Sequence, residues 1–306
     1  MAGVALATAG GTAVAVQSRI NGELGVRLAD GIAAAVVSFG LGLLVLLVLV
    51  PTTASGRRGL AALRTALARG ALRPWHCLGG VCGAFLVATQ GLTIGTLGVA
   101  VFTVAVVAGQ SGSSLLVDRA GVGPGGPQRV TASRLAGAVL TVLAVLIAVG
   151  DRLGDPGALV LAVLPLLAGV GIAWQQAVNG RVRAAAGSTM TATLVNFVVG
   201  TAALLAAFAV EVAVRGWPAG AAFPTEPWLY LGGPLGVSFI ALAAALVGLT
   251  GVLLLGLATI AGQIVGAVLL DLLLPTAASS PGPATLIGAA LTLVAVLVAT
   301  LGPLRR

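Results

Sequence analysis

The chain has 306 residues, of which 58% are hydrophobic and only 8% charged, and its formal net charge is +8. Its mean hydropathy is +1.13, which excludes a water-soluble globular protein because a soluble core cannot use so much apolar surface. The apolar residues form continuous runs of roughly eighteen or more, whereas the strands of a membrane barrel alternate apolar and polar residues. The sequence therefore predicts an all-α integral membrane protein, in which each spanning helix satisfies its own backbone.

Apolar runs bounded by charges, glycine, proline or turn residues predict ten spanning helices. The first run has no basic segment before it, so we expect a retained helix and not a signal peptide. In chain order the helices are expected near residues 2–19, 32–50, 75–93, 96–117, 132–150, 158–176, 190–213, 228–249, 251–273 and 283–302.

Two polar stretches interrupt this series. The stretch from Pro51 to Pro74 carries five arginines among leucines and alanines. It is either a short amphipathic helix on the membrane surface or a plain basic loop. The second stretch, Asp151 to Gly157, has turn chemistry and predicts the boundary between two domains, residues 1–150 and 151–306.

Every basic residue is an arginine, and the arginines lie between the apolar runs. They are therefore interpreted as topology signals and not as a nucleic-acid site. With ten helices, the more basic side holds twelve of the sixteen, which predicts a plasma-membrane protein with both termini in the cytoplasm. The twelve are Arg57, Arg58, Arg64, Arg69, Arg73, Arg119, Arg129, Arg134, Arg181, Arg183, Arg305 and Arg306; the other four are Arg19, Arg27, Arg152 and Arg215.

The second half of the chain repeats the first. At an offset of 158 residues the matched pairs are Gln17 with Gln175, Asn21 with Asn179, Gly22 with Gly180, Phe39 with Phe197, and Gly42 with Gly200. At an offset of 153 they are Trp75 with Trp228, Leu78-Gly-Gly80 with Leu231-Gly-Gly233, Gly83 with Gly236, Gly95 with Gly248, Gly109-Gln110 with Gly262-Gln263, and Asp118 with Asp271. Each half has five helices, an odd number, so the second copy must enter the membrane from the opposite side. Such inverted repeats are a hallmark of secondary transporters, which bind substrate between the repeats.

Amide side chains inside the apolar runs are candidate solute ligands, although they can also bind neighbouring helices. Gln17 and Asn21 share one helix face, and Gln175 and Asn179 repeat the arrangement. These four amides either line or gate a pathway, or Asn-Gly ends each helix in a left-handed turn while glutamine bonds across helices. Further amides and one aromatic residue add to the polar content of the bundle: Gln90, Trp174, Gln176 and Asn196.

Gln110 and Gln263 are the strongest candidates for direct contact with a solute. Each lies about two turns before an acidic residue, Asp118 or Asp271. Asp118 is either a loop residue beside Arg119 or a functional acid. A carboxylate as close to hydrocarbon as Asp271 must face protein, pair with a cation or take up a proton, which makes Asp271 a candidate for ion coupling.

No constellation for catalysis, ATP hydrolysis or metal binding is present in the sequence. Cys77 and Cys82 lie in one apolar run, where a thiol behaves as a small hydrophobe. With His76 they supply too few ligands for a metal cage. We therefore expect no enzyme activity, no disulfide, no metal and no cofactor.

The duplicated motifs, an early QxxINGxL followed by SFxxG, LGGxxG after tryptophan, and GQ with aspartate eight residues beyond the glutamine, resemble the YdcZ-like family of the drug/metabolite transporter superfamily. The resemblance covers essentially the whole chain, in a fused two-copy form. It implies ten helices in an inverted repeat, a plasma-membrane location and transport by alternating access.

The leading functional hypothesis is a secondary transporter of a small metabolite or drug-like solute. Sparse charge and many amides favour a neutral or zwitterionic solute. The alternative is a non-transporting membrane protein that binds partners or anionic lipids through its basic face. A functional monomer is expected because the fused chain supplies both halves, and a homodimer is the other possibility.

Overall fold

The computed structural model describes residues 2–127, 129–148, 156–216, 223–239, 242, 252–275 and 281–300. Within these ranges every regular element is helical, which confirms the predicted all-α fold class. The helices are α1 (Ala2–Leu28), α2 (Gly31–Thr52), α3 (Ala54–Ala68), α4 (Gly79–Arg119), α5 (Ala132–Ala148), α6 (Pro156–Ala186), α7 (Thr189–Arg215), α9 (Val252–Leu273) and α10 (Pro283–Thr300). A helical segment at 232–239 and two 3₁₀ turns, Pro74–Leu78 and Pro227–Tyr230, complete the described elements.

The helices present large apolar side chains to the outside of the bundle. Val160 is 70% exposed and Val214 is 78% exposed, as expected for surfaces that face lipid. Within the described residues, four stretches are long and apolar enough to cross a membrane: Gly31–Thr52, Pro74–Arg119, Val160–Ala186 and Thr189–Arg215. Shorter apolar helices add to them, so the chain has the composition and architecture of a multi-pass membrane protein.

α1 and α6 are longer than predicted, and the Asn-Gly pairs do not end them. α1 continues past Asn21 to Leu28, and α6 continues past Asn179 to Ala186. The glycines permit close helix contact here and do not form turns. A Cβ on Gly22 would lie 2.6 Å from the Ile94 side chain. The interpretation of Asn-Gly as a helix cap is therefore wrong.

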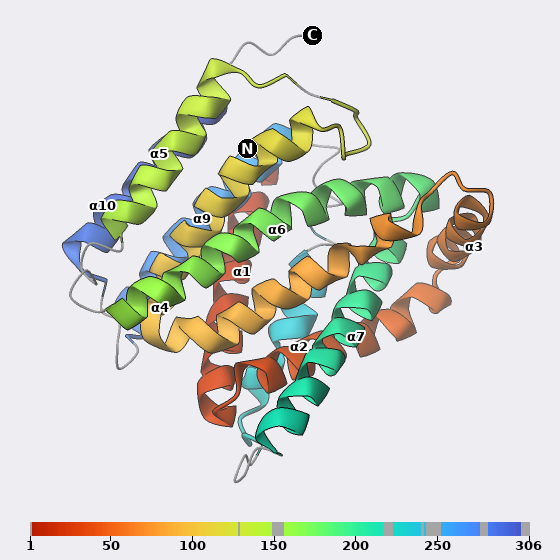
Figure 1. Cartoon of the computed structure of the whole chain (residues 1–306), viewed down its shortest axis with the longest axis horizontal. Helices are drawn as coiled ribbons and strands as arrows, with labels where there is room; N and C mark the ends of the chain where they lie inside the picture. The colour runs from red at the N-terminus through yellow and green to blue at the C-terminus, as the bar shows by residue number, and fades with distance from the viewer. Residues whose placement is uncertain are drawn as a thin grey trace.

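The third and fourth predicted helices form one kinked element, α4. The break falls at Gly98, where φ is 80° and ψ is 164°, a backbone conformation that favours glycine. Figure 1 shows α4 running across the molecule beside α6, then reversing and returning. The two parts of α4 thus correspond to the two spanning helices that were predicted here.

Some further predictions concern residues outside the described ranges. The eighth predicted helix is described only as the segment 232–239 and residue 242. The predicted domain boundary at 150–151 lies in an undescribed stretch and stays a prediction, as do the positions of Arg152, Arg305 and Arg306.

The basic stretch after α2 folds as the amphipathic helix α3. Its Gly56, Gly59 and Leu63 are buried, and Leu63 packs with residues of α6 and α7. Its Arg57, Arg58 and Arg64 side chains are exposed. Of the two alternatives for this stretch, the helix is the one observed.

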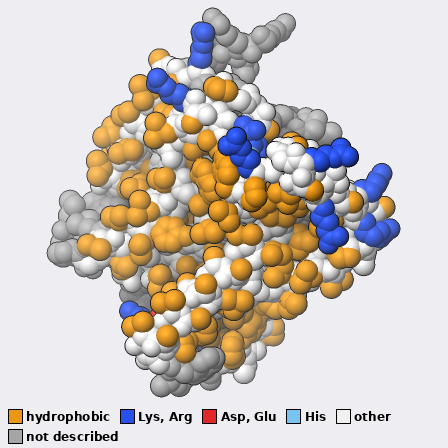
Figure 2. All heavy atoms as spheres, turned by 45° about the vertical axis from the view of Figure 1, so that its right-hand side comes forward, with side chains coloured by type: hydrophobic (Ala, Val, Ile, Leu, Met, Phe, Trp, Pro, Cys, Tyr) orange, Lys and Arg blue, Asp and Glu red, His pale blue; other side chains and the backbone are white. Residues whose placement is uncertain are grey.

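The arginines are concentrated at one end of the bundle, which we call the basic end. It holds α3, the end of α4 and the loop at 120–131, to which Arg181 of α6 donates hydrogen bonds at Gly121 and Val122. Figure 2 shows basic side chains along one rim and a broad hydrophobic surface beside it. The other end, which we call the opposite end, has the Gly98 kink. Which end faces the cytoplasm stays a prediction.

Helices from the two halves cross at the centre. The rings of Phe39 on α2 and Phe197 on α7 lie 4.8 Å apart between centroids. Each ring rests on a glycine of the other helix, because a Cβ on Gly42 would lie 2.2 Å from Phe197 and one on Gly200 would lie 2.4 Å from Phe39. α5 and α10 lie side by side at one edge (Figure 1).

Candidate functional site

A buried polar cluster joins α1 to the first part of α4. Asn21 Nδ2 donates to Gln90 Oε1 over 2.7 Å, and Gln90 Nε2 donates to Ser18 Oγ over 2.9 Å. Ser18, Asn21 and Gln90 are 4%, 1% and 2% exposed. Buried polar groups of this kind need internal partners; the Gln90 side chain bonds to both other residues, while Asn21 Oδ1 has no hydrogen-bond partner among the described residues. We call this group the first amide cluster.

A second amide cluster joins α6 to α7. Gln175 Nε2 and Asn179 Nδ2 both donate to Asn196 Oδ1, over 2.8 and 2.9 Å. Asn196 is 4% exposed, while Gln175 and Asn179 are partly exposed. Asn196 occupies the position of α7 that matches Ser38 of α2 at the repeat offset of 158.

Each amide pair also packs against the glycines of the other half. For the Gln17 and Asn21 pair of α1, a Cβ on Gly232 would lie 2.1 Å from Asn21 Oδ1, and one on Gly236 would lie 2.9 Å from Gln17 Nε2. The four predicted residues Gln17, Asn21, Gln175 and Asn179 therefore lie where one half contacts the other. The equivalent distances in the second cluster are 2.6 Å from Gly79 to Asn179 Oδ1 and 2.8 Å from Gly83 to Gln175 Nε2.

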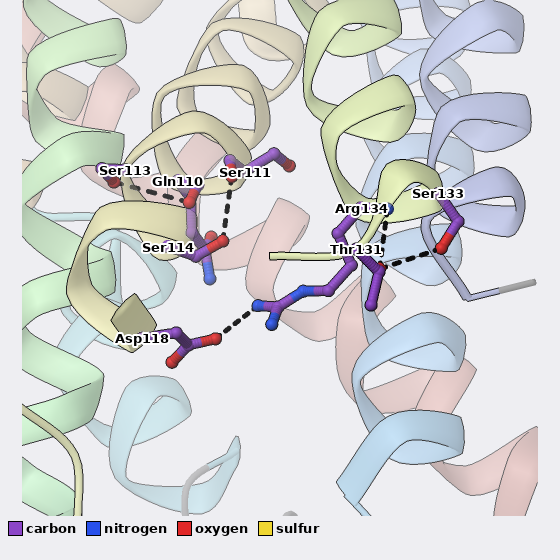
Figure 3. Close-up of polar contacts among 8 residues, drawn as sticks. All are labelled: Gln110, Ser111, Ser113, Ser114, Asp118, Thr131, Ser133 and Arg134. Atoms are coloured by element: carbon purple, nitrogen blue, oxygen red, sulfur yellow. Dashed lines mark hydrogen bonds and ion pairs between the residues drawn. The ribbon is translucent and has the colours of Figure 1, made fainter. Parts of the chain in front are cut away.

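A polar hollow lies at the basic end, between the end of α4, α6 and the loop that follows α4. Its volume is about 310 Å³, and the polar side chains that line it are those of Ser114, Asp118 and Gln176. Gln110 Nε2 donates to Gln176 Oε1 over 3.1 Å. In Figure 3 the Gln110, Ser114 and Asp118 side chains lie on successive turns of α4. The structure thus brings Gln110 and Asp118 to one polar surface.

Asp118 and Arg134 form an ion pair beside this hollow (Figure 3). Their side chains are 38% and 30% exposed. Asp118 belongs to the last turn of α4, and Arg134 belongs to the first turn of α5. The interpretation of Asp118 as a loop residue is therefore wrong, and its charge is balanced by Arg134.

Asp271 lies at the opposite end of the molecule and is 2% exposed. Its Oδ1 accepts a hydrogen bond from the Val99 backbone N–H over 3.0 Å, and its Oδ2 accepts one from Ala100 over 2.7 Å. These N–H groups begin the second part of α4, directly after the Gly98 kink. The carboxylate therefore faces protein, where two donors and the positive end of a helix offset its burial.

Gln263 lies on α9, where α9 packs against α1. A Cβ on Gly11 of α1 would lie 2.9 Å from the Gln263 backbone nitrogen, and one on Gly169 of α6 would lie 2.9 Å from that of Gln110. The two glutamines thus take equivalent places in two separate helix contacts. Among the described contacts, none joins Gln110 to Gln263.

Cys77 and Cys82 are free thiols. Within the described residues, no group of three or more His, Cys, Asp or Glu side chains is arranged to hold a metal ion. His76 is buried, and its Nδ1 contacts the backbone of Arg73. His76 and Cys77 belong to the turn that precedes α4, and Cys82 lies in α4, where it packs against Gly171 of α6.

The repeated motifs and the interlocked halves have a counterpart among known proteins. Residues 2–147 and 160–298 each match the family described as "Putative inner membrane exporter, YdcZ". The chain belongs to this family. Both copies of the YdcZ unit are therefore present in one polypeptide, as the duplicated motifs predict, and the family resemblance is confirmed.

Comparison with solved structures supports the same fold for this YdcZ-family chain. One of four matching chains, described as "Crystal structure of protein", is 21% identical and covers 98% of this chain and 95% of its own length, with a TM-score of 0.52. At this identity the likeness concerns the fold alone. None of the curated proteins matches this chain.

Several residues that complete the site were not predicted as site residues. Ser18 and Gln90 complete the first amide cluster, Asn196 completes the second, Gln176 lines the polar hollow, and Arg134 pairs with Asp118 beside it. For Asn196, alignment of the repeats places it opposite Ser38, a polar residue on the same helix face. For Arg134 the sequence offers no signal, because its distance to Asp118 depends on how α5 packs.

Proposed function

We propose that this YdcZ-family protein is a secondary-active transporter that moves a small neutral or zwitterionic solute by alternating access. One observation carries the proposal: equivalent acids at the two ends have unequal exposure. Asp271 is 2% exposed, while the side chain of Asp118 is 38% exposed beside a hollow. An inverted repeat with one end packed and the other open is what an alternating-access protein requires of each resting state.

The chemistry of the polar hollow supports the class of solute. The amides of Gln110 and Gln176 can donate and accept hydrogen bonds, and serine hydroxyls add further donors and acceptors. The ion pair between Asp118 and Arg134 leaves this surface without a large net charge. A neutral or zwitterionic molecule therefore suits it better than a multiply charged ion.

The test is ligand-induced thermal stabilisation of the purified full-length protein, screened with a panel of amino acids, sugars, polyols and toxic neutral solutes. A ligand at about one hundred times its Kd should stabilise the folded state by about 2.7 kcal/mol. We expect Gln110→Ala and Gln176→Ala to abolish the stabilisation, because Gln176 lines the hollow and Gln110 bonds to it. Ser133→Ala is the matched control, because the Ser133 hydroxyl contacts Thr131 at the start of α5 and does not line the hollow.

A second function is favoured by the surface of α3. Its three exposed arginines, Arg57, Arg58 and Arg64, suit anionic lipid head groups. If the protein acts only through this surface, no solute will stabilise it, and vesicles with phosphatidylglycerol will stabilise it more than phosphatidylcholine vesicles. Loss of that preference in a triple alanine variant of these arginines, together with no solute effect, would reject transport.

A further inference from the structure

The kink at Gly98 gives the second part of α4 its own helix N-terminus, which is buried inside the protein. The first N–H groups of a helix have no partners within it, and at this kink two of them bond to Asp271. Each carboxylate oxygen takes one N–H. The bond links α9 of the second half to α4 of the first half, so Asp271 closes a contact between the halves at the opposite end.

The sequence contains a second Gly-Val pair and a second aspartate, each in the other half of the repeat. Gly95-Thr-Leu-Gly-Val99 matches Gly248-Leu-Thr-Gly-Val252 at the offset of 153, and at that offset Asp118 matches Asp271. Each Gly-Val pair precedes its own aspartate by about five helical turns. By this repeat, the relation of Asp118 to the beginning of α9 corresponds to the relation of Asp271 to the beginning of the second part of α4.

Asp118 has a different partner in this structure. Its carboxylate pairs with Arg134, and its side chain is far more exposed than that of Asp271. The described part of α9 starts at Val252, and Gly251 lies outside the described residues, so the break that would match Gly98 is inferred from the repeat alone. Equivalent acids therefore occupy two different states at the two ends of one chain.

We infer that Asp271 and Asp118 are alternately engaged latches: each carboxylate, when engaged, caps the helix that follows the Gly-Val pair of the other half and closes its own end of the transporter. In this structure the Asp271 latch is engaged at the opposite end, and the Asp118 latch is released and held by Arg134. The inference rests on the proposed function. It adds which hydrogen bonds hold each end closed and why the two ends are not closed at the same time.

The two latches cannot be engaged at the same time, because both lie on the same pair of helices. α4 carries both an acid, Asp118, and a capped beginning at Val99; α9 carries the equivalent acid, and the repeat offset of 153 assigns it the equivalent beginning at Val252. A rocking movement of α9 against α4 that withdraws Asp271 from Val99 and Ala100 shifts the other ends of the same two helices together. Two charge-assisted bonds are lost at one end while two form at the other, so the energies of the two states stay close.

Cysteine accessibility in the purified full-length protein tests this without any solute. With Cys77 and Cys82 replaced by alanine, Ala15→Cys reports on the opposite end, because Ala15 is 1% exposed and packs with Val99 and Ala100. Ser114→Cys reports on the polar hollow. A water-soluble maleimide should label Ser114→Cys quickly and Ala15→Cys slowly.

Asp271→Asn should reverse this pattern, because the two N–H groups bond to different oxygens of Asp271 and an asparagine places an NH2 donor where one of these oxygens accepts. Labelling of Ala15→Cys should become about tenfold faster, which corresponds to a shift of about 1.4 kcal/mol, while labelling of Ser114→Cys slows. Asp118→Asn should leave Ala15→Cys slow and Ser114→Cys fast. The double variant should return towards the original ratio, because the two losses oppose each other.

Asp30→Asn is the matched control. Asp30 also caps a helix through two backbone N–H groups, those of Ile32 and Ala33, but both bond to Oδ1 and both lie in α2 of the same half. It should change neither reporter. If Asp271→Asn speeds labelling at both reporters, or at neither, the latch is rejected. Reciprocal labelling without any solute effect would instead keep the latch and reject the proposed solute transport.

Discussion

The two amide clusters perform the same task with different residues. In the first, Asn21 of α1 bonds to Gln90 of α4. In the second, Gln175 and Asn179 of α6 bond to Asn196 of α7. The sequence explains the difference: the residue that matches Gln90 is Ala243, and the residue that matches Asn196 is Ser38. Each amide pair still packs against the glycines of the other half, while its hydrogen-bond acceptor within its own half has moved from one helix to another.

The ends of the molecule differ in the same way. At the opposite end an acid is buried against backbone N–H groups, and at the basic end the equivalent acid meets an arginine near solvent. The comparison teaches that a duplicated sequence does not impose identical contacts. A protein that alternates between two states needs such inequality, because each state must close only one end.

The largest expected effect comes from the glycines on which both clusters rest. A Cβ on Gly80 would lie 2.1 Å from the Asn196 carbonyl oxygen, so Gly80→Ala must push α4 away from α7. We expect a loss of about 3 kcal/mol in the free energy of unfolding, measured by thermal unfolding in detergent. Gly40→Ala is the control, because nothing lies within 4 Å of its Cβ position, and an equal loss there would contradict the close-contact argument.

A smaller effect on the free energy of unfolding should distinguish Asn196 from Ser38, its counterpart in the first half. Asn196→Ala leaves the Gln175 and Asn179 amides without their acceptor, and we expect a loss of about 1–2 kcal/mol. Ser38→Ala removes a buried hydroxyl that has no hydrogen-bond partner, so stability should be unchanged or slightly higher. Thermal unfolding of both variants under one condition decides the point; equal losses would mean that the acceptor has not moved.

The smallest effect concerns the single bond between Asn21 and Gln90. A double-mutant cycle with Asn21→Ala and Gln90→Ala should give a coupling energy of about 0.6 kcal/mol, the average for polar pairs between membrane helices, and below about 1.7 kcal/mol. The cycle is measured from the unfolding free energies of the four proteins. Complete additivity would show that the two side chains act independently despite their 2.7 Å contact.

Much of the architecture follows from the sequence because its causes are local or repetitive. The apolar runs give the helices, the charges between them give the topology signals, and the duplication gives the inverted halves. The sequence could single out Gln110, Asp118 and Asp271 as candidates because polar residues in apolar runs are few and repeat at fixed offsets; their role in a site stays a prediction. Helix ends were less accurate, since Asn-Gly was interpreted as a turn although it permits a close helix crossing.

Tertiary structure alone decided which partner each polar residue has. That Asp271 caps a helix of the other half, that Asp118 meets Arg134, and that the two amide clusters use different helices all depend on contacts between residues far apart in the chain. The physical reason is that hydrophobic patterning places a residue on a helix face but not beside a particular neighbour. The neighbour is chosen by the close helix crossings that the glycines allow.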